Sequence, residues 1–155
     1  MTSAEWHTSQ SPSEMLYALL IAEKRGRKLR LFACACCRGV WFLLSDPRSR
    51  RGVEAAEGLA DGHPSAAFLD DEYKVADAVY SESFDSSDKD GRMPEAEREA
   101  AQAVPVVVLR YDTPSVAQYH ASIAAEHAVS AAALHEAESH PGGAIAEYVC
   151  RAAQQ

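Results

Sequence analysis

The alanine-rich stretch between Ala117 and Ala137 places the strongest constraint on how this chain can fold. Alanine has the highest helix propensity of all residues, and few β-branched side chains compete with it here. A Thr-Pro pair at 113–114 precedes the stretch and Pro-Gly-Gly at 141–143 follows it, so we expect one long helix ending near Ser139. In a chain of 155 residues, other helices must cover the sides of such a helix.

Six further segments show helical patterning, so the sequence predicts an all-α fold, an irregular bundle of about six or seven helices in a single domain over 1–155. The first expected helix runs from an N-cap at Ser11 to a stop at Gly26, the second from Arg27 to about Leu44, and the third from an N-cap at Asp46, with Pro47, to a stop at Gly62. The fourth begins at His63-Pro64, and its apolar face consists of Phe68, Leu69, Tyr73, Ala76, Val79 and Tyr80. A short acidic helix is expected from Pro94, and a last helix from Ala144 to Ala153. The segment from Arg27 to Leu44 is the most hydrophobic, and we expect it to form the central helix of the core. The polar segment 85–94 is expected to form a loop.

Val104 to Asp112 is the segment whose conformation the sequence leaves open. The three consecutive valines at 106–108 favour a strand by propensity. A lone strand, however, has no partner elsewhere in this sequence with which to form hydrogen bonds. We therefore favour a buried helical or extended connector over a strand.

Charge is distributed unevenly along the chain. The segment from Lys24 to Arg51 holds nine of the fifteen Lys and Arg residues and one acid, Asp46, so it carries +8 while the rest carries −16. Its candidate residues for contact with an anion or a partner are Arg25, Arg27, Lys28, Arg30, Arg48, Arg50 and Arg51. We favour neutralisation of this positive charge by acids of the same molecule or of another subunit over nucleic-acid binding. The net charge of −16 on the rest of the chain repels a polyanion, and Phe32 and Trp41 are expected to be buried, so they would not be exposed for contact with bases.

Cys34 and Cys37 suggest a metal site as an alternative. They are three residues apart on an expected helix, so both thiolates can face one ion, and Cys150 with His120 or His127 would complete a zinc site. A single such pair is weak evidence without a second pair at matching spacing. We therefore favour Cys36 and Cys37 as small buried side chains, and we expect no cofactor.

The remaining motifs do not indicate a catalytic site. His120, His127 and His135 share the expected long helix, but neither HExxH nor ExxH is present. A partial match to a calcium-binding loop covers Ser86, Asp88, Asp90, Gly91, Met93, Pro94 and Glu97. Ser86 replaces the usual first Asp and Pro94 stiffens the loop, so a solvated acidic loop is favoured. We expect the chain not to be an enzyme.

Part of the N-terminal region resembles known sequences. The residues concerned are Thr2-Ser3-Ala4-Glu5-Trp6, then Lys28-Leu29-Arg30-Leu31-Phe32-Ala33-Cys34-Ala35-Cys36-Cys37-Arg38, and then Trp41, Leu44, Asp46, Arg48-Ser49-Arg50, Val53-Glu54 and Ala56-Glu57. In these residues the chain resembles an uncharacterised family of paralogous planctomycete proteins, over Met1 to Ala60. The resemblance implies alanine-rich helices after this block and supplies no mechanism. Members of the family continue into a segment similar to LLRDIFGNPF, so we expect this C-terminus, ending at Gln155, to diverge or to be cut short.

The sequence also bears on location and partners. No apolar run reaches the roughly 18 residues of a membrane span, and residues 1–6 lack the pattern of a signal peptide. We therefore expect a cytoplasmic protein with reduced cysteines and no membrane contact. The favoured hypothesis is a non-enzymatic helical domain that binds another protein or a second copy of itself. The alternatives are a nucleic-acid-binding accessory domain that uses Lys24 to Arg51, and a small zinc-binding protein that uses Cys34 and Cys37.

Overall fold

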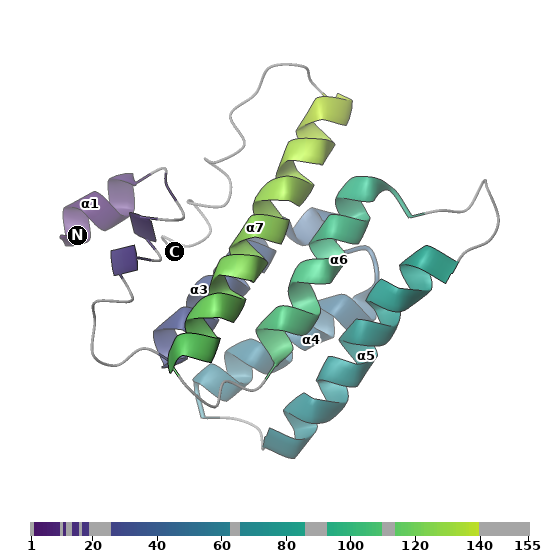
Figure 1. Cartoon of the computed structure of the whole chain (residues 1–155), viewed down its shortest axis with the longest axis horizontal. Coiled ribbons are helices and arrows are strands. Elements are labelled where there is room, and N and C mark those ends of the chain that lie inside the picture. Colours follow the sequence, from purple (N-terminus) through teal and green to yellow (C-terminus); the bar gives the residue numbers. More distant parts are fainter. Residues whose placement is uncertain are drawn as a thin grey trace.

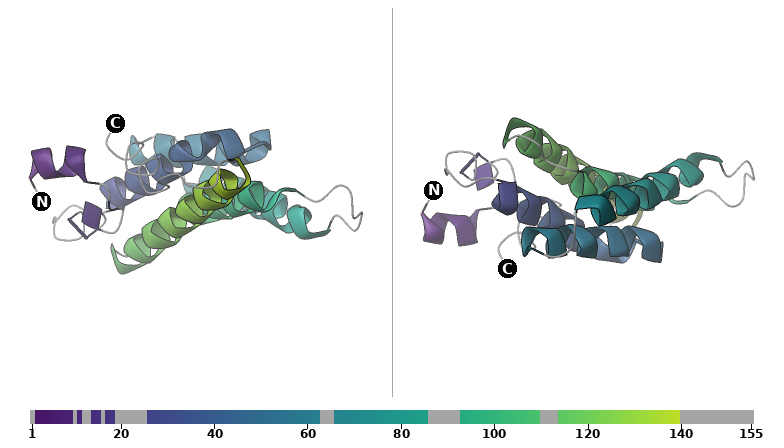
Figure 2. Two further views of the ribbon diagram at one scale, coloured as in Figure 1. Left: turned by 90° about the horizontal axis from the view of Figure 1, so that it is seen from above. Right: turned by 90° about the horizontal axis from the view of Figure 1, so that it is seen from below.

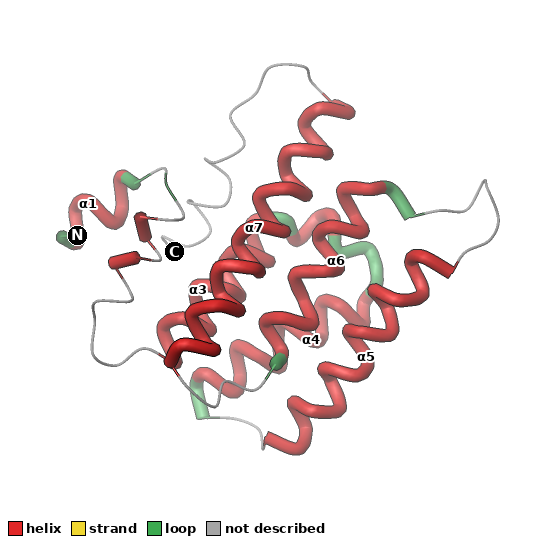
Figure 3. The backbone as a smooth tube through the Cα atoms, in the orientation of Figure 1, coloured by secondary structure: helices red, strands yellow, loops and turns green. Residues whose placement is uncertain are grey.

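The computed structural model describes residues 2–9, 11, 14–15, 17–18, 26–62, 66–85, 93–109 and 114–139. These residues form helices and no strand, which confirms the predicted all-α fold (Figure 3). The α-helices are α1 (Ser3–Thr8), α3 (Gly26–Gly39), α4 (Pro47–Ala60), α5 (Ala66–Asp85), α6 (Glu95–Val108) and α7 (Pro114–Ser139), and a 3-10 helix, η1 (Trp41–Leu43), follows α3. The helix predicted over 144–153 lies outside the described residues, as do residues 86–92 of the predicted loop.

The main helices pack in two layers. α5, α6 and α7 lie side by side in one layer, and α3 and α4 cross behind it in the other (Figures 1 and 2). α6 is the most central helix because it contacts α3, α4, α5 and α7. The sequence predicted residues 27–44 for this central place. α3 does lie in the core, where it packs on α4, α6 and α7, but α6 contacts one more helix. None of the helices in the described part of the chain is both long and apolar enough to cross a membrane.

α4 begins and ends at the residues that the sequence indicated. The Asp46 side chain accepts a hydrogen bond from the backbone N–H of Arg48 at 2.7 Å, and Pro47 occupies the first helical turn. Both features stabilise a helix N-terminus, where backbone N–H groups have no partner within the helix. After α4, Gly62 has a φ of +90°, a conformation that glycine adopts without steric cost. Local chemistry therefore determines both ends of α4.

The helix predicted from Arg27 to Leu44 is shorter than expected. α3 begins at Gly26, which was expected to be a stop, and it ends at Gly39. The chain then turns through η1, so that Leu43 and Leu44 are buried and the following helix runs back along α3. Glycine has a low helix propensity, so an end at Gly39 agrees with local preference.

The open segment after Ala103 is helical. Residues 104–108 form the last part of α6, while residues 110–112 lie outside the described part. The strand alternative was wrong, and the favoured buried connector is the end of a 14-residue helix. Pro105 lies within this helix and has no N–H to donate to the carbonyl four residues earlier. Val104, Val107 and Val108 are fully buried, so tertiary packing outweighs both the proline and the strand propensity of valine.

Small side chains allow the helices of the two layers to approach closely. The fully buried alanines of α7 recur every three or four residues, at Ala117, Ala121, Ala124, Ala128 and Ala131. In α4, a Cβ added at Gly52 would lie 3.0 Å from Val104 Cγ1 and 3.2 Å from Val108 Cγ2. Glycine therefore sets the distance between α4 and α6, and the predicted long alanine-rich helix is confirmed as α7.

The apolar face predicted for α5 is confirmed in most positions. Leu69, Ala76 and Val79 are buried, and Tyr73 packs against the core. Phe68 is 43% exposed, so its assignment to this face was wrong. Phe68 precedes Leu69 on the helix and therefore points about 100° away from it.

At the N-terminal end, Ser11 caps a short helical stretch. Its hydroxyl accepts a hydrogen bond from the Glu14 N–H at 3.2 Å, as the N-cap prediction requires. Met15, one residue further on, is fully buried and belongs to the hydrophobic core. A described part of the N-terminal region is therefore attached to the bundle.

Candidate binding surfaces

Two arginines of the basic segment connect α3 to α4. Arg27 Nη2 lies 2.6 Å from Asp61 Oδ1, and its Nε donates to the Ala60 carbonyl at 2.9 Å. Arg38 donates to both oxygens of Glu57, at 2.9 Å and 2.6 Å. The paired geometry with Glu57 raises the pKa of the Arg38 guanidinium. These two arginines therefore face carboxylates of the neighbouring helix.

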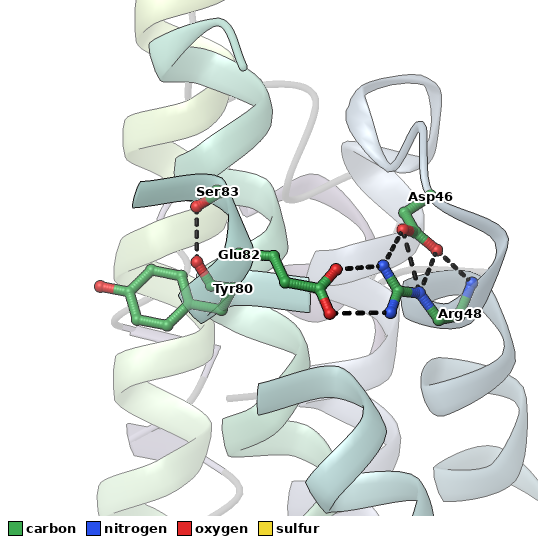
Figure 4. A network of polar contacts seen from close by, with 5 residues as sticks. All are labelled: Asp46, Arg48, Tyr80, Glu82 and Ser83. Carbon is green, nitrogen blue, oxygen red and sulfur yellow. Dashed lines mark hydrogen bonds and ion pairs between the residues drawn. The ribbon is translucent and has the colours of Figure 1, made fainter. Parts of the chain in front are cut away.

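Arg48 and Arg51 connect α4 to α5. Arg48 lies between two carboxylates, with Nη2 2.9 Å from Asp46 Oδ2 and 2.6 Å from Glu82 Oε2 (Figure 4). The hydrogen bonds from Arg48 lower the pKa of Asp46 and of Glu82, and those carboxylates raise the pKa of Arg48. Arg51 Nε lies 3.0 Å from an oxygen of Glu72, whose side chain is 9% exposed. The N-terminal half of α4 is thus held against α5 by charged hydrogen bonds.

Arg30 is buried, with 6% of its surface exposed. Its Nη1 donates hydrogen bonds to the carbonyls of Val107, at 2.9 Å, and Leu109, at 3.1 Å. Carbonyls at a helix C-terminus have no partner within the helix and carry partial negative charge. Arg30 therefore stabilises the C-terminal end of α6, an inward role that its sequence context did not indicate.

Trp41 lies beside two guanidinium groups. The Cζ atom of Arg38 is 3.9 Å from the centre of the Trp41 ring, and that of Arg50 is 5.5 Å away. Phe32 is buried as expected, whereas Trp41 is only partly buried. The next residue, Phe42, is 54% exposed and contacts His135 edge-on, with 4.9 Å between ring centres. This corner between α3 and α4 is a cation–π cluster at the surface.

Most of the described positive charge in the basic segment thus has a partner within the chain. Six of the seven basic residues described between 26 and 51 contact a carboxylate or a backbone carbonyl of the chain: Arg27, Arg30, Arg38, Arg48, Arg50 and Arg51. The seventh, Lys28, is exposed on α3, and Arg25 lies outside the described residues. Four of these residues, Arg27, Arg38, Arg48 and Arg51, face a carboxylate of the chain itself.

The three described cysteines are buried in the core and form no disulfide with one another. Burial raises the pKa of both Cys34 and Cys37, and each is raised further by a neighbouring thiol. A thiol must lose its proton to bind zinc, so this environment disfavours the first step. Within the described residues no group of three or more His, Cys, Asp and Glu side chains could hold a metal ion, and Cys150 lies outside them.

The three histidines of α7 have different surroundings. His127 Nδ1 lies 3.0 Å from Glu99 Oε2 and so links α7 to α6. Burial lowers the pKa of His120, and the charge of Arg30 lowers it further. His120 and His127 share one side of α7, but seven residues separate them by about 10 Å along the axis. One metal ion therefore cannot bind both.

The partial calcium loop is described only at its C-terminal end. Met93 and Pro94 precede α6, and Glu97 lies in its first turn. Ser86, Asp88, Asp90 and Gly91 lie outside the described residues. The structure therefore gives this motif no ligand geometry.

The outer face of α7 carries apolar side chains that the sequence analysis did not select. Tyr119 is 63% exposed and Val116 is 36% exposed. Helical spacing places both on the side of α7 opposite the buried alanines. The sequence signal for an exposed apolar face was therefore the presence of larger apolar residues at 116 and 119 and of alanine at 117, 121 and 124.

Comparison with known proteins gave no relative. A scan of protein-family models and searches of curated proteins and of solved structures found no match to this chain. Function is therefore inferred from the side chains described above.

Proposed function

We propose that this chain is a non-enzymatic helical domain that binds another protein. The observation that carries the proposal is the pairing of the basic segment, in which arginines on α3 and α4 face carboxylates on α4 and α5. Positive charge used in this way is poorly available to a polyanion. A surface rich in acidic and exposed apolar side chains remains, and such a surface suits a protein partner.

The α6–α7 pair shows this surface composition best. The acids with described side chains are Glu95, Glu97, Glu99, Glu126 and Glu136, and the single Lys or Arg residue of the two helices is Arg98. Exposed Tyr119 adds an amphipathic aromatic side chain, a type enriched at protein interfaces. Acidic side chains attract a positively charged partner over a distance, and the aromatic side chain supplies contact area once the partner is bound.

The groups from which an enzyme would draw a nucleophile and a base have structural contacts instead. The raised pKa values of Cys34 and Cys37 keep both thiols protonated near neutral pH. The imidazole of His127 contacts a carboxylate of the adjacent helix. These environments favour a binding role over a catalytic one.

Photo-crosslinking tests the proposal in cells that express the chain. A benzophenone amino acid replaces Tyr119 in one variant and Asp77, an exposed acid of α5, in the control. The proposal predicts a discrete protein adduct at position 119 that resists nuclease and is absent at position 77.

Two in vitro results would contradict the proposal. One is a salt-sensitive mobility shift of DNA or RNA that is lost in Arg27→Ala/Lys28→Ala. The other is zinc retained in native mass spectra and lost in Cys34→Ser/Cys37→Ser.

A further inference from the structure

α6 and α7 are antiparallel neighbours, and one contact fixes their register. Glu99 of α6 meets His127 of α7 at 3.0 Å. Because both helices rise by the same distance per residue, a step of seven residues along each brings Val106 level with His120. The C-terminal half of α6 therefore lies beside the N-terminal half of α7, at the front of the layer in Figure 1.

An apolar stripe runs along this part of the surface. Val116, Tyr119 and Ile123 follow the i, i+3, i+7 spacing of one helix face, and that face is turned away from the buried alanines. Val116 and Tyr119 are exposed, while Ile123 and, on α6, Val106 are partly exposed. We call the stripe and the acids beside it the α6–α7 outer face.

Acidic side chains lie beyond one end of the stripe, past Ile123. Glu126 is exposed on α7, two turns from Tyr119 on the same side of the helix. Glu95 is exposed on α6, on the same side as Val106, and its contact with Arg98 is 3.5 Å long. α7 contains no Lys or Arg. The outer face therefore combines an apolar stripe with negative charge at one of its ends.

We infer that the α6–α7 outer face is the docking surface of this domain and that its partner is a basic amphipathic helix of another protein. The inference rests on the proposed function and names its surface and its partner. Two adjacent helices present ridges of side chains along which a third helix packs, with its apolar residues over the stripe. Lysine or arginine residues beside those apolar anchors would face Glu95 and Glu126.

A second copy of the chain fits this surface less well. A symmetric contact between two outer faces would bring the glutamates of one copy near those of the other. Of the arginines in the described residues, Arg27, Arg38, Arg48 and Arg51 already pair with carboxylates of the same chain. Charge complementarity therefore favours a basic partner over a second outer face.

The test measures binding of labelled peptides to the whole 155-residue chain by fluorescence anisotropy. The probe is a capped helical peptide of about 18 residues, or five turns, with Leu on one face and Lys elsewhere. A peptide with Glu in place of Lys and a scrambled Lys peptide without an apolar face are the controls. The inference predicts binding of the first peptide at least about tenfold tighter than of either control.

A pair of matched variants locates the binding site. Tyr119→Ala/Glu126→Gln removes an exposed ring and a charge from the outer face, and Phe68→Ala/Asp77→Asn removes the same types of group from α5. We expect the first variant to weaken binding about tenfold and the second by less than twofold, with unchanged circular dichroism for both.

The alternative outcomes separate the inference from the proposed function. Equal binding by the two variants, or a chain dimer that Tyr119→Ala dissociates, would overturn the inference and leave a protein-binding domain. Failure to bind any of the peptides, together with tight binding of a labelled oligonucleotide, would overturn both.

Discussion

The two halves of the bundle are held together by different kinds of contact. α3, α4 and α5 are joined by arginine–carboxylate pairs, such as Arg38 with Glu57 and Arg48 with Glu82. α6 and α7 are joined by close packing of alanines and valines, with His127–Glu99 as a polar link. The arginines of α3 and α4 thus face carboxylates of neighbouring helices, whereas α6 and α7 have acids available to a partner.

The difference has an energetic consequence. Exposed ion pairs contribute roughly 0–1 kcal/mol each and weaken with salt. Buried alanines leave no space for larger side chains, so a change of volume there costs more. The two halves are therefore expected to respond to different substitutions.

The largest expected effect is overpacking in the alanine-packed half. Ala128→Leu adds a branched side chain at a fully buried position of α7 and should lower the free energy of unfolding by about 3 kcal/mol. Denaturant unfolding followed by circular dichroism measures this change. Ala133→Leu, at a partly exposed position of the same helix, is the control and should change stability by less than about 0.5 kcal/mol. Equal effects would show that the alanine stripe is not closely packed.

Arg30 links the two halves, and its replacement is expected to have the next largest effect. Arg30→Met keeps much of the side-chain volume but leaves the carbonyls of Val107 and Leu109 without this donor. We expect a loss of about 1–3 kcal/mol, with faster hydrogen exchange near the end of α6. Lys28→Met, on the exposed side of α3, should be close to neutral. A neutral Arg30→Met would contradict the role of Arg30 as a helix cap.

A smaller effect is expected in the ion-paired half. Arg48→Gln removes the contacts with Asp46 and Glu82 and should cost about 1 kcal/mol or less. Unfolding at low and high salt provides the check, since high salt should reduce the difference between wild type and variant. A cost above 2 kcal/mol that is independent of salt would mean that these groups are more buried than the structure indicates.

The smallest expected effect is a dependence of stability on pH, which arises from the contacts of Arg48 with Asp46 and Glu82. The folded-state pKa values of Asp46 and Glu82 lie below their ordinary values because Arg48 donates hydrogen bonds to both. Their contribution is therefore present above the unfolded pKa of about 4 and is lost as pH falls through the folded values. Thermal unfolding between pH 6 and 3 should show that the melting temperature falls more steeply with decreasing pH for the wild type than for Arg48→Gln. Parallel curves would contradict the assignment.

The sequence predicted features that depend on local chemistry. Asp46 with Pro47 fixed the start of α4, and the alanine density fixed α7. It failed where tertiary packing decides the outcome. Val104 and Pro105 disfavour a helix locally, yet burial against α3, α4 and α7 makes them part of α6.

The candidate contact residues show the same limit. The uneven charge was visible in the sequence, but which carboxylate faces each arginine depends on how the helices pack. Arg38 and Glu57 are 19 residues apart, and Arg30 and Val107 are 77 apart. No local pattern indicates such pairs, so Arg30 was grouped with surface residues although it is buried.

The central claim is that the arginines of the basic segment are engaged within the bundle, and NMR of arginine side chains tests it most directly. In the whole 155-residue chain at low temperature, we expect slowed rotation and separately resolved Nη signals for Arg30, Arg38 and Arg48. Glu57→Gln should alter the Nη signals of Arg38. Averaged, rapidly exchanging signals for all three guanidinium groups would contradict the account. The basic segment would then be an open surface, and nucleic-acid binding would become the favoured function.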